Sequence, residues 1–75
     1  MDEDLLGRLK SWRADRAREL KVPTFVVFTD ATLMAIAEQR PADDAALVSI
    51  SGIGATKLER FGAEILGVVR ASTAS

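Results

Sequence analysis

The stretch that most constrains this chain is the run from Val22 to Leu33, which holds its only dense group of β-branched and aromatic residues. Such a composition usually indicates a β-strand. The sequence offers no second run of this kind for it to pair with, and an unpaired strand would leave backbone N–H and C=O groups unsatisfied. We therefore predict a short extended or 3₁₀-like crossing that the surrounding helices bury.

The segments before and after this run show the three- and four-residue apolar spacing of amphipathic helices. The first helix is expected to follow the acidic residues 2–4 and to end near Lys21, because Pro23 disfavours helical backbone in the residue before it. The last helix is expected over about residues 55–69. Residues 71–75 are small and polar and are expected to form a frayed end or a linker.

Shorter helices are expected between these two. One would be capped by Thr29 or Asp30 and would close at Arg40, and the next would be capped by Asp43. The buried positions expected around the latter are Leu47, Val48 and Ile50. Within the first helix, Arg13 lies beside the apolar stripe and would need a hydrogen-bond acceptor if buried. The patterns together predict an all-α fold.

The residue types present exclude most catalytic chemistry. The 75 residues, enough for one small domain, include neither cysteine nor histidine, so a disulfide, a thiolate nucleophile and a Ser-His-Asp triad are all unavailable. The adjacent Asp43 and Asp44 are explained better by helix capping than by general acid/base catalysis. We expect no metal and no cofactor. Wholly apolar runs such as residues 25–28 are far too short to span a membrane.

The charges are nearly balanced and interspersed. Ten basic and eleven acidic residues give a formal net charge of −1, whereas strong sequence-independent binding to nucleic acids usually accompanies a clear positive excess. Any binding of phosphate would therefore depend on a local patch of positive charge.

The segment from Ile50 to Lys57 is the candidate for such a patch. Gly52 and Gly54 precede the last helix, where small residues let a phosphate or another backbone approach the free N–H groups of the first turn. Lys57 lies within that turn and would reach the same anion. The alternative is a glycine-rich turn that merely lets two helices pack.

Three strings of the sequence, taken together, resemble the HRDC domain, which is named for its place at the C-termini of helicases and of ribonuclease D. The strings are Leu9-x-x-Trp12-Arg13, Val22-Pro23-x-Phe25-Val26-Val27-Phe28-x-Asp30-Ala31-Thr32-Leu33-x-x-Ile36-Ala37, and Ile50-x-Gly52-Ile53-Gly54-x-x-Lys57-Leu58-Glu59-Arg60-Phe61-Gly62. They cover almost the whole chain in the family's order and look most like the domains of bacterial RecQ-type DNA helicases. The resemblance implies a compact all-α helical bundle of SAM-like fold, with a turn similar to that of helix-hairpin-helix modules.

The resemblance also implies a function. Residues 1–75 would form a single HRDC domain from the C-terminal region of a larger, cytoplasmic, nucleoid-associated ATP-dependent DNA helicase. The domain would be monomeric and non-catalytic, would bind single-stranded or partially duplex DNA weakly, and would contact other domains of the parent helicase. Two alternatives stay open, which are a docking module that regulates the helicase with little DNA contact, and the HRDC domain of a ribonuclease D-type enzyme.

In this family the aromatic residue that follows the proline, together with nearby basic residues, forms the nucleic-acid surface. The matching positions are Phe25, where tyrosine is commoner, and Lys21. Burial in the core is the simpler interpretation of the Phe25 ring. The candidate DNA-binding residues are Lys21, Phe25, Gly52, Gly54, Lys57 and Arg60.

Overall fold

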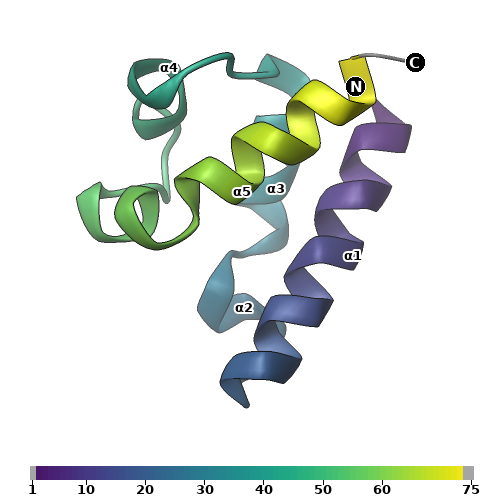
Figure 1. The fold of residues 1–75 in the computed structure, drawn as a ribbon, viewed down its shortest axis with the longest axis vertical. Helices are drawn as coiled ribbons and strands as arrows, with labels where there is room; N and C mark the ends of the chain where they lie inside the picture. Colours follow the sequence, from purple (N-terminus) through teal and green to yellow (C-terminus); the bar gives the residue numbers. More distant parts are fainter. Residues whose placement is uncertain (1, 74–75) are drawn as a thin grey trace.

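The fold is a bundle of helices, seen in a computed structural model that describes residues 2–73. In chain order the helices are α1 (Glu3–Leu20), α2 (Thr24–Val27), α3 (Asp30–Gln39), α4 (Asp44–Val48) and α5 (Ala55–Thr73). Figure 1 shows the long helices α1 and α5 with α3 behind them, α4 at the upper left and α2 at the bottom. No strand occurs between residues 2 and 73, which confirms the predicted all-α class.

The ends of α1 follow from local side-chain and backbone chemistry. The Asp2 carboxylate accepts a hydrogen bond from the Leu5 N–H at 3.0 Å and thereby caps the helix. At the other end Lys21 adopts a left-handed conformation, and its N–H donates to the carbonyls of Ala17 and Arg18. This ending is common for helices and confirms the predicted stop near Lys21.

The two shorter helices begin and end where the sequence places their caps. Thr29 Oγ1 accepts from the Thr32 N–H at 3.3 Å, so the threonine is the side chain that caps α3. The helix closes at Arg40, whose backbone is left-handed. Asp43 caps α4 by accepting from the Ala46 N–H at 2.8 Å.

The run that was expected to be a short extended or 3₁₀-like buried crossing is a single turn of α-helix, α2, followed by extended backbone at Phe28. Pro23 stands at the start of this turn with φ −62°, a value that suits a helix beginning. Successive side chains on a helix point in different directions, so a turn that buries Val27 directs Phe25 and Val26 outward. The expectation of burial was wrong for these two residues.

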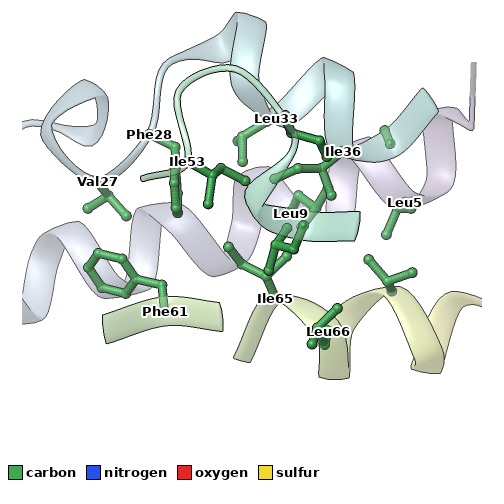
Figure 2. Close-up of a cluster of buried hydrophobic side chains, with 14 of the residues drawn as sticks. Leu5, Leu9, Val27, Phe28, Leu33, Ile36, Ile53, Phe61, Ile65 and Leu66 are labelled. Carbon is green, nitrogen blue, oxygen red and sulfur yellow. The ribbon is translucent and has the colours of Figure 1, made fainter. Parts of the chain in front are cut away.

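The core is one cluster of apolar side chains to which every helix contributes. Its members include Leu5, Leu9, Val27, Phe28, Leu33, Ile36, Leu47, Ile53, Phe61 and Ile65. Figure 2 shows Val27 and Phe28 on the same side of the core as the ring of Phe61, which comes from α5. The prediction of burial was wrong for Val48, which is exposed because the short helix α4 turns its neighbour Leu47 to the core.

Arg13 is the one buried cation of the described core, and its two terminal nitrogens find acceptors as predicted, while its buried Nε has no hydrogen-bond partner within residues 2–73. Its Nη1 donates to the Phe28 carbonyl at 2.9 Å and its Nη2 to Asp30 Oδ1 at 2.7 Å. The hydrogen bond and the charge of this guanidinium hold the pKa of the Asp30 carboxyl below its ordinary value. Arg13 thus connects α1 to the backbone between α2 and α3.

Helix α5 is longer than the apolar pattern predicted. It continues to Thr73, and Ser72 is buried, so residues 71–73 are neither a frayed end nor a linker. Residues 74–75 of that prediction lie outside the described range. Within this helix, a Cβ at Gly62 would meet side chains, 2.9 Å from Leu58 Cδ1 and 3.8 Å from Leu47 Cδ2.

Candidate nucleic-acid interface

The α2 turn carries the most exposed aromatic ring of the described chain. Phe25 is 67% exposed and its neighbour Val26 is 46% exposed. The other aromatic side chains pack together inside, with the rings of Phe28 and Phe61 each within about 6 Å of the Trp12 ring. Burial in the core, the simpler interpretation of Phe25, is therefore wrong. An exposed flat ring is a surface on which a nucleic-acid base can stack.

Two of the predicted site residues, Lys21 and Arg60, are exposed cations. Lys21 is exposed and lies just before Pro23 and α2. Arg60 is exposed on α5, with its guanidinium 5.2 Å from the centroid of the Phe61 ring. Within residues 2–73 neither of them forms an ion pair, so both charges are available to an anionic ligand.

Lys57 is also close to α2, but its ammonium is directed at protein atoms. Nζ donates to the carbonyls of Val26 and Val27 and lies 5.1 Å from the centroid of the Phe28 ring. Burial, followed by the positive charge of Arg60, lowers the pKa of Lys57. The side chain therefore joins the beginning of α5 to the end of α2.

The two glycines before α5 differ in what holds them. Gly52 has φ +97°, and a Cβ at this position would collide with the hydroxyl of Thr32 in α3. Gly54, whose carbonyl accepts the first hydrogen bond of α5 from the Leu58 N–H, has no neighbouring atom within 4 Å of a Cβ position. The positive φ and the nearby Thr32 thus require glycine at position 52. At position 54 the space around a Cβ is open, so a side chain would fit there.

This difference yields a prediction for a matched pair of variants. Gly52→Ala is expected to lower the free energy of unfolding by about 1–2 kcal/mol, because a side chain is strained at positive φ and also displaces Thr32. Gly54→Ala is expected to cost less, about 0.5 kcal/mol, because alanine is a poorer N-cap than glycine but would meet no neighbouring atom. Urea unfolding followed by circular dichroism measures both. Equal losses for the two variants would contradict this assignment.

Acidic residues neutralise one further cation beside Phe61. The Arg16 guanidinium lies 5.4 Å from the centroid of that ring, but it pairs with Glu19 at 3.3 Å and with Glu64 at 3.5 Å. Glu64 in turn accepts a hydrogen bond from the Trp12 indole N–H at 3.1 Å. Among the cations close to Phe61 and α2, these contacts engage Arg16, whereas Lys21 and Arg60 have no ion pair in residues 2–73.

Contacts and chain position relate several of the predicted site residues to α2: Lys57 donates to its carbonyls, Arg60 is close enough to Lys57 to affect its pKa, and Lys21 adjoins α2 in the chain. We use the name α2 face for the group Lys21, Phe25, Val26, Lys57 and Arg60. Gly52 packs instead against α3. The sequence reasoning missed Val26 as an exposed residue. Pro23 as a helix start was the signal that could have revealed it, since helical phase places residues 25 and 26 together.

Residues 2–73 contain no helix that is long and apolar enough to cross a membrane. In the same range, no three side chains of the types His, Cys, Asp or Glu are grouped so that they could hold a metal ion.

Comparison with known families identifies the chain. The sequence profile of the HRDC domain matches residues 2–69, which is most of its length. This chain belongs to the HRDC domain family. The resemblance that the three sequence strings indicated is therefore confirmed.

Curated relatives of this HRDC domain are much longer proteins. The ATP-dependent DNA helicase UvrD2 of Mycobacterium tuberculosis is 59% identical over 73 residues, which are 97% of this chain and 10% of that protein. The ATP-dependent DNA helicase RecQ of Pasteurella multocida is 38% identical over 69 residues, which are 92% of this chain and 11% of that protein. The HRDC domain thus spans about a tenth of the length of these relatives.

Solved structures of HRDC domains share the fold. The third HRDC domain of Deinococcus radiodurans RecQ superposes with a TM-score of 0.95 at 32% identity, covering 100% of this chain and 99% of that one. The HRDC1 domain of RecQ from the same organism gives a TM-score of 0.68 at 44% identity, with both chains fully covered. The expected compact HRDC-type bundle is confirmed.

Proposed function

We propose that this HRDC domain is a non-catalytic, DNA-binding accessory domain of an ATP-dependent DNA helicase. The relatives named above are such helicases, and the domain spans only a small part of each. The observation that carries the DNA-binding part is the 67% exposed ring of Phe25; the exposed Lys21 adjoins α2 in the chain, and the exposed Arg60 lies near Lys57, which contacts α2. A base would stack on the ring while the cations contact the adjoining phosphates.

The composition of the α2 face sets the strength of this binding. Two uncommitted cations allow few phosphate contacts, and the domain as a whole carries a net charge of −1. We therefore propose weak binding to single-stranded or partially duplex DNA, with a shallow dependence on salt concentration. Bases exposed in single strands suit the face best, because duplex stacking hides the base surface that Phe25 needs.

Phe25→Ala is expected to weaken binding of a labelled single strand by roughly 5- to 150-fold, equivalent to about 1–3 kcal/mol for one stacked base. Fluorescence anisotropy at low salt measures this change. Phe25→Tyr keeps the ring and is expected to bind like the parent. Because the ring is exposed, the alanine variant should unfold at the same urea concentration as the parent, which excludes misfolding as the cause.

A matched control is Met34→Ala on α3, which removes another exposed apolar side chain from outside the α2 face. This variant is expected to leave the affinity unchanged. Parent protein that shows no association with single strands at low salt, or a Phe25→Ala variant that binds like the parent, would contradict the proposed function.

The parent protein is proposed from the relatives. Identity is higher to UvrD2, at 59%, than to RecQ of Pasteurella multocida, at 38%, which favours a parent of the UvrD2 kind over the RecQ kind that the sequence strings most resembled. Either parent would be a cytoplasmic enzyme acting near the nucleoid, with the HRDC domain as one of its modules. Reading the coding sequence on both sides of the domain tests this, and a nuclease instead of helicase motifs would overturn it.

A second candidate function is docking onto another domain of the same helicase. Met34 on α3 and Val48 on α4 are each about 40% exposed, and the exposed acidic residues Glu38, Asp43 and Asp44 are near them in the chain. Deleting the domain from the full helicase, compared with substituting Phe25 alone, separates the two functions. Under docking, deletion changes unwinding while Phe25→Ala does not.

A further inference from the structure

The carbonyl groups at the end of α2 are held by cations from two different helices. Lys57 of α5 donates to the carbonyls of Val26 and Val27, and Arg13 of α1 donates to the next carbonyl, that of Phe28. The final carbonyls of a helix have no partner within the helix and carry partial negative charge. Three consecutive carbonyls therefore receive hydrogen bonds from positively charged side chains.

Helix α2 needs such support because little else in its own sequence stabilises it. It has four residues, a single turn, and a helix that short is not stable by itself in water. Pro23 precedes it, and no side chain caps its N-terminus by a hydrogen bond. Its stability must come from contacts with the remainder of the domain.

The surroundings of Lys57 fit a fixed contact better than a free anion-binding group. Its Nζ lies 5.1 Å from the centroid of the Phe28 ring and 5.9 Å from that of Phe61, so aromatic faces flank the ammonium. Two of the three ammonium hydrogens are engaged by the carbonyls of α2. To reach a phosphate, the side chain would have to give up these contacts.

We propose that Lys57 is a positioning residue, whose ammonium fixes the α2 turn and thereby the Phe25 ring, and that it is not itself a phosphate ligand. The inference rests on the proposed function for its effect on DNA, but the contact with α2 can be tested without DNA. It assigns the lysine of the glycine-rich segment a different role from the one that the sequence pattern predicts. Phosphate contacts then fall to Lys21 and Arg60.

The decisive variant is Lys57→Met, which keeps the length and apolar stem of the side chain but removes the donors. Hydrogen exchange is measured at the Phe28 amide, whose N–H donates to the Thr24 carbonyl and so reports closure of the turn. We expect about tenfold faster exchange at this amide, since hydrogen bonds from a charged group have been lost. Lys10→Met removes an exposed charge from α1 and should leave this exchange rate unchanged.

Single-strand binding of the same variants gives the second readout. A positioning role predicts that Lys57→Met binds about three- to tenfold more weakly but with an unchanged slope of log affinity against log salt concentration. A phosphate ligand would instead reduce that slope by about 0.7. A reduced slope, or an unchanged exchange rate at Phe28, overturns the proposal. If the parent binds no DNA, the proposed function fails, while the exchange experiment still decides whether Lys57 holds α2.

A measurement on the unaltered chain covers the case in which Lys57→Met does not fold. The ammonium nitrogens of Lys57 and Lys21 are followed by ¹⁵N NMR during titration with a single strand. We expect the Lys21 signal to shift and the Lys57 signal to stay near its starting position, because its carbonyl partners do not change. A shift at Lys57 as large as that at Lys21 overturns the proposal.

Discussion

Phe61→Ala is expected to lower the free energy of unfolding by about 3–5 kcal/mol, the usual cost of removing a buried phenylalanine ring. The ring centroid lies 5.7 Å from that of Trp12 and 5.7 Å from that of Phe28, both in edge-on contacts. Its loss would leave a cavity between α1, α5 and the segment after α2. Lys57 would also lose one of the two rings beside its ammonium.

The effect is large relative to the stability of the whole domain. At ordinary values per residue, a domain of this size is stable by about 4–11 kcal/mol, so the variant is expected to be partly unfolded at room temperature. Urea unfolding monitored by Trp12 fluorescence and by circular dichroism measures the loss. Phe61→Leu refills most of the space and should cost less than half as much. A Phe61→Ala variant within about 1 kcal/mol of the parent would show that the ring is not central to the core.

Arg13→Met is expected to lower the free energy of unfolding by about 2–3 kcal/mol. Methionine can occupy the space of the aliphatic stem, so the loss comes from the buried Phe28 carbonyl, which would have no donor, and from the bond to Asp30. Thermal and urea unfolding measure the change. A neutral result would show that water replaces the guanidinium at the Phe28 carbonyl.

Asp30→Asn removes the negative charge from one of the two partners of Arg13 and, with it, the pH dependence that this carboxylate gives to the stability of the parent. The pKa of Asp30 is lowered from 3.8 in the folded protein, so the carboxylate stabilises the fold above that value, and this contribution is lost as the pH falls through the lowered pKa. The stability difference between the parent and Asp30→Asn should therefore be constant near neutral pH and shrink below about pH 4. A difference that persists unchanged at lower pH would contradict the assigned pairing.

Local signals were enough to predict most helix boundaries. Pro23 and the charged residues before it indicate the end of α1, and Asp43 is a typical cap that begins α4 where predicted. These signals act within a few residues, so the sequence alone carries them. The need of Arg13 for an acceptor was also visible, although its partners, Phe28 and Asp30, depend on how α1 packs against the following segment.

The α2 turn could not be predicted from propensity, because tertiary contacts determine it. Residues 24–27 have the composition of a strand, yet hydrogen bonds from Arg13 and Lys57 hold the carbonyls at the end of this segment in a helical turn. Lys57 is distant in sequence from this turn, so no local pattern reveals the contact. For the same reason, the sequence could not show that Phe25 is exposed while Phe28 is buried.

The Asp2 side chain has a practical consequence for experiments on excised domains. One of its carboxylate oxygens accepts the Leu5 N–H at the start of α1, and the other pairs with Arg40 at the end of α3. A fragment cut after this residue would therefore lose one contact at each of two helix ends. Expression vectors, affinity tags and deletion boundaries should leave Asp2 in place, so that any change in helicase behaviour reports the removal of the domain and not the fraying of its remnant.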